Sequence, residues 1–477
     1  MKILWEAPMQ SRPKLQQDIL ADVAIIGGGM AGVLTAYRLQ RHGIKPVILE
    51  AGRTGDGMSK VTTAKITSQH GLIYDYLIGK FGKTKARQYA QANQAAIDAY
   101  QHIIHENNIS CHFERRDAYL FSKKDEYQIK SEVTAARDAG LPAVFTKDVE
   151  LPFKVAGAVR FSDQAQFHPM EFLSAIAPEV TIYEQSPVQE IKGHVVSTEE
   201  GSITAKKIII TTHYPILNAP GYYFLRMYQE REYVLALEHA QKLDGMYLSV
   251  DEDGHSFRNY DQYLLFGGEA HHTSYNRDGG RYKMLKREAR RLYPDCTTAY
   301  EWSAQDCMTL DRVPYIGKYS ASTDDMYVAT GFNKWGMTSS MVSAMILTDL
   351  ITGAKNEFAD VFSPQRMSVT TKRLMEEGSC SVSGLVLKKF KVPVKELCDL
   401  ENGTGGVIDY YGNKVGVYKD ENGEVFAVST KCPHMGCELE WNPDDLAWEC
   451  PCHGSRFDYR GNVLNTPATK GCRVQLK

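Results

Sequence analysis

Four cysteines and two histidines crowd into two short segments near the end of the chain, "CPHMGC" (432–437) and "CPCHGS" (450–455). Each segment offers one cysteine and one histidine in C-x-H or C-x-x-H spacing, together with one further cysteine. Thiolate sulfur and imidazole nitrogen are the ligands of zinc sites and of some iron–sulfur centres. Since the other six of the ten cysteines are scattered, the two segments predict a metal or redox site.

Zinc and iron are the two competing interpretations. A zinc knuckle usually pairs cysteines in one C-x-x-C and histidines in another segment, with no surplus thiol. The present layout resembles instead the Rieske [2Fe-2S] domain of the disulfide-bearing kind found in respiratory Rieske proteins. The resemblance implies that Cys432 and Cys450 bind one iron and that His434 and His453 bind the other. It also implies that Cys437 and Cys452 form a disulfide.

Two further residues bear on the reduction potential that the resemblance implies. Ser455 matches the family serine that donates a hydrogen bond to a cluster sulfur. Phe457 stands where high-potential members carry a tyrosine whose hydroxyl makes a similar bond. With one donor missing, we expect a potential below the upper part of the Rieske range.

The other end of the chain carries a phosphate-binding pattern. Within residues 22–52, Gly27, Gly29 and Gly32 fill G-x-G-x-x-G between a short apolar run and a stretch with helical spacing. A diphosphate would lie at the N-terminus of that helix, where free N–H groups favour an anion. Glu50 closes the next predicted strand and is placed to accept hydrogen bonds from ribose hydroxyls. The pattern predicts a dinucleotide site, with a ligand-free glycine turn as the alternative.

The fingerprint alone does not separate NAD from FAD. Four other segments lead to FAD: "SKVTTAKITSQHG" (59–71), "KKIIITTHYP" (206–215), "YLLFGGEAHH" (263–272), and "TLDRVPYIG" with "MYVATGFNKWGMTSSMVSA" (309–344). With these segments the chain resembles, from about residue 22 to 353, the D-amino-acid-oxidase-like family of FAD-dependent oxidoreductases, which includes glycine and sarcosine oxidases. Besides the residues above, the resemblance implies FAD contacts from Thr62, Thr63, Thr212, Gly331, Trp335, Gly336 and Thr338. Helix capping alone is the alternative for the last turn.

The substrate residues carry weaker signals. Arg258 is a candidate for binding a carboxylate, and His70 and His271 are candidates for acid–base chemistry, with a structural role as the alternative for each. Sarcosine-oxidase-like members hold the substrate carboxylate with a lysine just past the closing glycine turn, where this chain has Thr338. Cys307 precedes the same region, where some relatives attach FAD covalently; a buried, unreactive cysteine is the alternative.

These patterns predict a fold of α/β plus all-β class. We expect a Rossmann-like FAD-dependent oxidoreductase over residues 1–357, with nucleotide-binding parts at about 20–80, 200–225 and 305–357. An antiparallel-sheet substrate domain, drawn from the β-type runs at 151–192 and 230–273, is inserted between these parts. A connector (358–389) and a small all-β Rieske domain (390–477) complete the chain.

A flavin takes two electrons at once, whereas a [2Fe-2S] cluster takes one at a time. The combination predicts an enzyme that oxidises a small amine or amino-acid-like substrate and sends electrons through the cluster to an external acceptor. Two alternatives stay open: electrons run from an external reductase to the flavin, or the Rieske domain is a structural docking module of an ordinary oxidase.

The net charge of −3 and the lack of a basic stretch argue against a nucleic-acid partner. No apolar run is long enough for a signal peptide or a membrane span, so the sequence predicts a cytoplasmic protein without membrane insertion.

Overall fold

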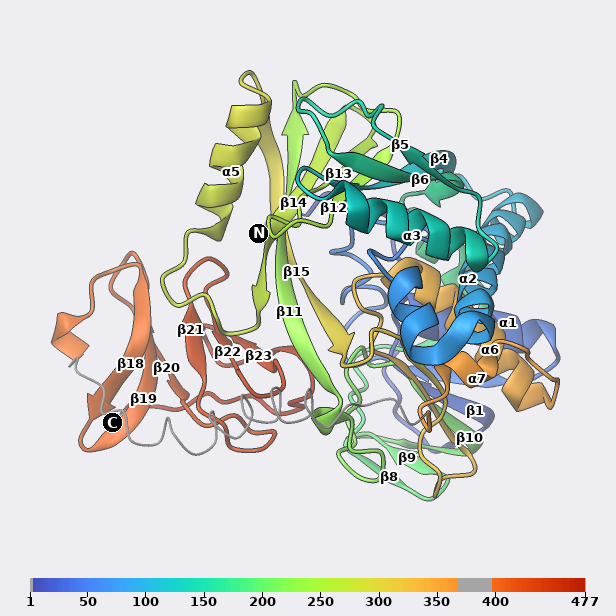
Figure 1. Ribbon diagram of the computed structural model, residues 1–477. Coiled ribbons are helices and arrows are strands. Elements are labelled where there is room, and N and C mark those ends of the chain that lie inside the picture. The colour runs from blue at the N-terminus through green and yellow to red at the C-terminus, as the bar shows by residue number, and fades with distance from the viewer. Residues whose placement is uncertain (1–2, 367–396, 477) are drawn as a thin grey trace.

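Two large sheets and two small ones organise the protein (Figure 1). The computed structural model describes residues 3–366 and 397–476. One large sheet with its helices forms the nucleotide-binding part, the second large sheet stands beside it, and the two small sheets form the C-terminal part. The predicted combination of α/β and all-β architecture is confirmed.

The nucleotide-binding sheet has a parallel centre because its strands are apolar on both faces, as in the fully buried β2. Its main path runs β16 (Tyr315–Lys318), β17 (Met326–Thr330), β10 (Ser202–Ile210), β1 (Ile19–Ile26), β2 (Pro46–Leu49) and β7 (Thr181–Tyr183), with β8 (Glu190–Lys192) and β9 (Val195–Ser197) attached at β10. Helices α1 (Met30–Arg41) and α6 (Gly336–Thr352) pack against each other beside this sheet. Residues 181–192, expected in the substrate sheet, belong here because β7 pairs in parallel with β2.

The second large sheet is mostly antiparallel. Its path runs β15 (Thr297–Thr309), β11 (Met227–Glu238), β14 (Tyr263–His272), β13 (Ser256–Tyr260), β12 (Met246–Ser249), β4 (Glu114–Ser122), β6 (Gly157–Gln166) and β3 (Lys65–Ile66), while β5 (Ala143–Thr146) pairs with β6. Residues 305–309, expected in the nucleotide-binding part, extend β15 because β15 pairs with β11 along its whole length.

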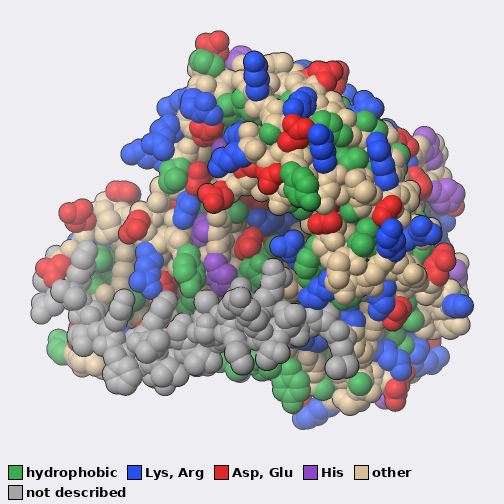
Figure 2. Space-filling view, in the orientation of Figure 1, with side chains coloured by type: hydrophobic (Ala, Val, Ile, Leu, Met, Phe, Trp, Pro, Cys, Tyr) green, Lys and Arg blue, Asp and Glu red, His purple; other side chains and the backbone are tan. Residues whose placement is uncertain are grey.

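The other helices surround the two large sheets. They are α2 (Tyr74–Glu106), α3 (Glu126–Asp138), α4 (Pro169–Ile176), α5 (Arg281–Leu292) and α7 (Ala359–Phe362), with short 3-10 turns at Ala177–Glu179, Tyr223–Leu225 and Leu397–Asp399. Figure 2 shows Lys and Arg side chains gathered over α5, whereas charges of both signs are interspersed over the rest of the visible face. Within the described ranges, no helix combines the length and the apolar character that crossing a bilayer requires.

The C-terminal part consists of short antiparallel strands. One sheet contains β18 (Thr404–Tyr410), β19 (Asn413–Lys419) and β20 (Val425–Ser429), and the other contains β21 (Glu440–Asn442), β22 (Ala447–Glu449), β23 (Arg456–Asp458) and β24 (Val463–Asn465). The segment 432–437 lies between β20 and β21, and the segment 450–455 lies between β22 and β23. Most of the predicted connector, from residue 367 on, lies outside the described residues.

Candidate functional site

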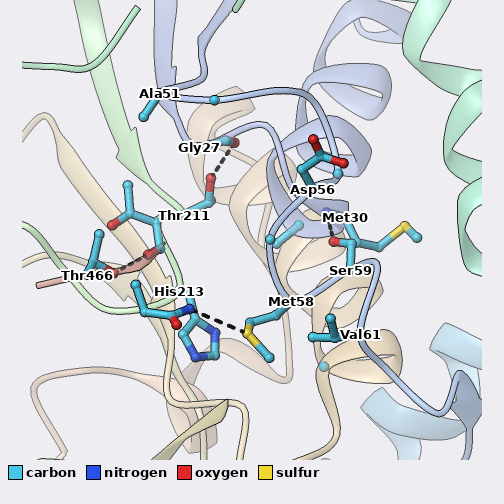
Figure 3. Close-up of a pocket in the computed structure, with 18 of the residues that line it drawn as sticks. Gly27, Met30, Ala51, Asp56, Met58, Ser59, Val61, Thr211, His213 and Thr466 are labelled. Carbon is cyan, nitrogen blue, oxygen red and sulfur yellow. Dashed lines mark hydrogen bonds between the residues drawn. The ribbon is translucent and has the colours of Figure 1, made fainter. Parts of the chain in front are cut away.

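A cavity of about 600 Å³ opens at the carboxyl ends of β1, β2 and β10 (Figure 3). Its wall includes the glycine turn with the loop after β2, the segment after β10, the faces of β11 and β15, the start of α6, and a segment that follows β23 in the C-terminal part. A crevice at the carboxyl ends of parallel strands is where open α/β folds bind nucleotides.

The glycine turn before α1 fits a diphosphate. Gly27 has a φ of +111°, which favours glycine. A Cβ on Gly32 would lie 2.0 Å from the Gly27 carbonyl oxygen, so only glycine allows α1 to begin so close to β1. A Cβ on Gly29 would meet only Ser59 Oγ at 3.4 Å, which leaves space on the cavity side. In Figure 3, Thr211 holds the turn through its hydroxyl, which donates to the Gly27 carbonyl at 3.0 Å.

Glu50 lies in the cavity wall at the end of β2. Its carboxylate accepts hydrogen bonds from the N–H groups of Gly28 and Gly52, each at 2.7 Å. Burial raises the pKa of Glu50, and these two bonds counteract the increase. A carboxylate has about four acceptor positions, so Glu50 can accept a further hydrogen bond from a ribose hydroxyl.

The other expected FAD residues divide into two groups. Thr62, Thr63, Thr212 and Gly336 line the cavity, whereas Gly331, Trp335 and Thr338 are not among its lining residues. Thr338 is fully buried, and its hydroxyl bonds both the N–H and the carbonyl of Thr67 at 3.0 Å. Trp335 stacks on His70, with ring centroids 4.6 Å apart. Thr338 and Trp335 therefore hold the loop after residue 62 against α6.

None of the three expected catalytic side chains lines the cavity. Arg258 is buried and donates to the carbonyls of Thr63 and Ala64, each at 2.7 Å, so it supports the loop from behind. His70 bonds Tyr89 Oη and the Thr67 carbonyl, and burial lowers its pKa to about 3.

His271 lies on β14, close to the C-terminal part, and its Nε2 bonds Tyr233 Oη at 3.1 Å. A histidine or an arginine in the sequence does not show which of its neighbours it will bond. In the described structure, all three side chains bond protein groups, and none of the three lines the cavity.

The part of the cavity beside β11 and β15, here called the substrate end because the proposed function places the substrate there, holds charged residues that the sequence analysis did not predict. Glu232, Asp306 and Lys334 line it beside Val234 and Ala304. Lys334 Nζ lies 3.1 Å from Glu230 Oε2 and 3.2 Å from Glu232 Oε2. Burial raises the pKa of Asp306 to about 7, and the Lys334 ammonium counteracts that increase. Three carboxyl groups thus lie near the Lys334 ammonium, and the charges of Lys65 and Arg231 also act on this group.

Strands β11 and β15 have two different faces because strand side chains alternate. On one face, Glu232 of β11 and Asp306 of β15 line the cavity, and Glu230 of β11 pairs with Lys334 beside them. On the other face, Gln229 and Gln305 contact the second cysteine–histidine segment. Gln229 Nε2 donates to the His453 carbonyl at 2.5 Å, and Gln305 Nε2 donates to the Gly454 carbonyl at 2.7 Å.

The same outer face carries a buried ionic network. Arg231 of β11 and Asp445 of the C-terminal part form an ion pair in which each side chain is 1% exposed. Ser303 of β15 donates to Asp445 Oδ1 at 2.8 Å. Arg456 completes the network with Asp445 at 2.9 Å and with Glu449 at 2.9 Å. In the sequence, the alternation of side chains along β11 indicates that the strand has two different faces. It does not reveal which domain covers each face.

The two cysteine–histidine segments converge at the edge of the C-terminal part. The imidazole rings of His434 and His453 lie 5.0 Å apart at 89°, and the thiols of Cys432 and Cys450 are hydrogen-bonded to each other. Both Nδ1 atoms are buried without a hydrogen-bond partner in the described structure. Burial lowers the pKa of His434 to about 4 and that of His453 to about 3, which keeps both rings neutral. These four side chains fit the two-sulfur, two-nitrogen ligand set of a Rieske cluster.

The residues around this site support the same arrangement. His434 Nε2 lies 2.6 Å from Asn218 Oδ1 in the nucleotide-binding part, which leaves Nδ1 for a metal. Cys437 and Cys452 form a disulfide between the two segments. Ser455 Oγ accepts the Ala468 N–H at 3.0 Å and contacts Cys432, while Phe457 is fully buried beside the cysteines.

Cys307 is placed unfavourably for covalent FAD attachment. It is 1% exposed, lies in an apolar cluster with Tyr214 and Tyr315, and is not among the residues that line the cavity. Burial raises the pKa of its thiol well above the ordinary value, which disfavours the thiolate that attachment needs.

Comparisons with known proteins agree with this geometry. The family model described as FAD dependent oxidoreductase matches residues 22–350, and the model described as Rieske [2Fe-2S] domain matches residues 390–475. The Rieske 2Fe-2S iron-sulfur protein YhfW of Bacillus subtilis (strain 168) is 36% identical over 97% of this chain and 94% of its own length.

Gamma-glutamylputrescine oxidoreductase of Escherichia coli (strain K12) is 21% identical over 73% of this chain and 87% of its own length. The structure of glycine oxidase from Geobacillus kaustophilus superposes with a TM-score of 0.62 at 21% identity, over 73% of this chain and 99% of that one. At this identity, the superposition shows that the fold is shared. The resemblances found in the sequence are confirmed.

Proposed function

Because the chain belongs to the FAD dependent oxidoreductase family and also carries a Rieske [2Fe-2S] domain, we propose that it oxidises a small amine or amino-acid-like compound and delivers the electrons singly, by way of the Rieske domain, to an external acceptor. FAD supplies two-electron chemistry and the cluster supplies one-electron chemistry when each is bound. Oxidation of a CH–NH unit to an imine releases two electrons and two protons, so each turnover serves two one-electron transfers.

One observation carries this proposal: a single layer of two strands, β11 and β15, separates the substrate end of the cavity from the segment that contains Cys450 and His453. Figure 1 shows these strands standing between the C-terminal part and the rest of the protein. Gln229 and Gln305 hold the segment directly against the layer. The buried pair of Arg231 and Asp445 fixes the two parts together. Such a permanent contact suits electron transfer within one chain.

The charges at the substrate end favour a cationic amine over a free amino acid. Glu230, Glu232 and Asp306 gather around Lys334, whose ammonium is already paired with both glutamates. A substrate ammonium would be attracted there, whereas a carboxylate would be repelled. The relative that is named for gamma-glutamylputrescine points to an amine as well.

Amine oxidation requires the neutral amine, so the ammonium must lose a proton before the reaction. Asp306 lines the cavity, and burial raises its pKa to about 7. A carboxyl group with that pKa exchanges protons readily at neutral pH. We assign to Asp306 the acceptance of the substrate proton and to Glu232 the binding of the ammonium.

A panel of diamines, monoamines and amino acids mixed anaerobically with the purified protein tests the proposal. We expect cationic amines to bleach the flavin and to yield the aldehyde after hydrolysis of the imine. The Glu232→Gln variant should raise the KM for the best amine about tenfold, as expected for loss of a charged hydrogen bond. Glu238→Gln, a change on the same strand outside the cavity lining, is the matched control.

The alternative functions give different results in this assay. A protein that is reduced only by an external reductase, and by no amine, would support the reverse direction of electron flow. Flavin reduction followed by reoxidation with dioxygen, while the cluster stays oxidised throughout, would support an ordinary oxidase. Either result would contradict the proposal.

A further inference from the structure

Part of the cavity wall comes from the Rieske domain. Six residues of one segment line the cavity together with the glycine turn: Val463, Leu464, Asn465, Thr466, Ala468 and Thr469. Figure 3 shows Thr466 on the side of the cavity opposite Met30 and Ser59. A group that fills the cavity would therefore contact both domains.

The segment is attached to residues that also line the cavity. Thr466 Oγ1 donates to the Thr212 carbonyl at 3.2 Å, at the carboxyl end of β10. Asn465 Nδ2 lies 4.0 Å from Met58 Sδ in the loop after β2. The segment thus lies against two sides of the nucleotide-binding part.

The position of the segment depends on the second cysteine–histidine segment. The Ala468 N–H donates to Ser455 Oγ at 3.0 Å, and the Cys450 N–H donates to the Ser455 carbonyl at 2.8 Å. Arg456 Nη1 donates to Asn465 Oδ1 at 3.0 Å. Residues that surround the cluster ligands therefore also hold the cavity wall in place.

One side chain in the segment is unusual for its position. Leu464 is apolar and yet 49% exposed, and it borders the cavity. A bound molecule that covered this side chain would remove apolar surface from water and gain affinity. The wall thus offers an apolar contact as well as polar ones.

We propose that the Rieske domain completes the FAD-binding site through residues 463–469, so that FAD affinity depends on a folded, cluster-bearing Rieske domain. The glycine turn binds the diphosphate side, and the Rieske segment covers the opposite side. Assembly of the cluster and retention of FAD are then coupled through Ser455. The inference concerns FAD binding alone and does not depend on the substrate or on the direction of electron flow.

Titration of the deflavinated full-length protein with FAD, followed by fluorescence quenching, tests the inference. For Leu464→Ala and Thr466→Val, we expect the Kd to rise at least about fivefold, which corresponds to about 1 kcal/mol. Val425→Ala is the matched control, because Val425 is also exposed, at 37%, on the Rieske domain but outside the cavity lining. The Rieske EPR signal and the iron content of each variant report whether the cluster is intact.

A second variant, His453→Ala, removes a cluster ligand without touching the cavity lining. We expect it to lose the cluster and to bind FAD more weakly as well. The inference is overturned if the Kd for FAD stays at the wild-type value in Leu464→Ala and Thr466→Val, whether or not their clusters are intact. It is also overturned if cluster loss in His453→Ala leaves the Kd unchanged.

Discussion

Replacing Arg231 by methionine should weaken the attachment of the Rieske domain to the rest of the protein. Arg231 is 1% exposed, and its guanidinium pairs with Asp445, which is equally buried. Methionine has a similar length and no charge, so the change removes the charge and keeps most of the volume. The remaining network would contain two carboxylates, Asp445 and Glu449, and one guanidinium, Arg456.

The expected loss follows from the burial of the partners. Removing one member of a buried ion pair costs about 3–5 kcal/mol, because the other charge stays buried without its partner. The double variant Arg231→Met/Asp445→Leu leaves Arg456 paired with Glu449 and should recover part of the loss. A comparison exists in the same interface: Arg277, which is 53% exposed, pairs with Glu440, which is 9% exposed, so water reaches one side of the pair and Arg277→Met should cost less than Arg231→Met.

Urea unfolding, followed by the visible absorbance of the cluster, measures these differences. With an m-value of about 3 kcal/mol/M, a loss of about 4 kcal/mol lowers the urea midpoint by about 1.3 M. Arg277→Met should shift the midpoint by a smaller amount. Equal shifts for Arg231→Met and Arg277→Met, or a double variant less stable than Arg231→Met alone, would refute the role assigned to the buried network.

Three other changes test separate parts of the site. Gly32→Ala places a Cβ 2.0 Å from the Gly27 carbonyl oxygen and should abolish FAD retention. Gly79→Ala, whose Cβ would have no atom within 4 Å, should retain FAD. Equal flavin content in the two purified variants would disprove the turn geometry. Since Asp306 has a pKa of about 7 and must be ionised to accept the substrate proton, kcat/KM for the amine should fall as the pH falls through about 7, and Asp306→Asn should flatten that profile; an unchanged profile argues against its role. Phe457→Tyr should raise the reduction potential of the cluster, measured by protein-film voltammetry, because a hydroxyl beside a ligand sulfur stabilises the added electron. An unaltered or lower potential would show that residue 457 does not lie beside a ligand sulfur.

Local patterns explain what could be predicted from the sequence. The turn around Gly27 and the two cysteine–histidine segments depend on residues that are close in the chain, so their spacing alone indicates their chemistry. The pairing of β11 with β15, in contrast, joins residues far apart in the sequence, and only this pairing brings Glu232 and Asp306 together. A polar residue on a strand gives no indication of which domain will cover it.

The positions of other candidate residues have a similar physical origin. Thr338 follows a glycine turn, as a flavin contact would, but its buried hydroxyl is used to hold the backbone of Thr67. His70 and Arg258 were expected at the substrate and instead support the loop after residue 62. Residues 463–469 gave no local signal at all, because their contact with the cavity depends on how two domains pack.

In our proposal, substrate electrons reach the Rieske domain within one chain. The protein is mixed anaerobically with a saturating concentration of the best amine, kept constant while the protein is diluted, and freeze-quench EPR follows the cluster. We expect the Rieske signal of the reduced cluster to appear after flavin reduction, at a first-order rate that is unchanged when the protein is diluted tenfold. Complete reduction of the flavin without that signal, or a rate that falls in proportion to protein concentration, would show that the electrons do not pass within one chain.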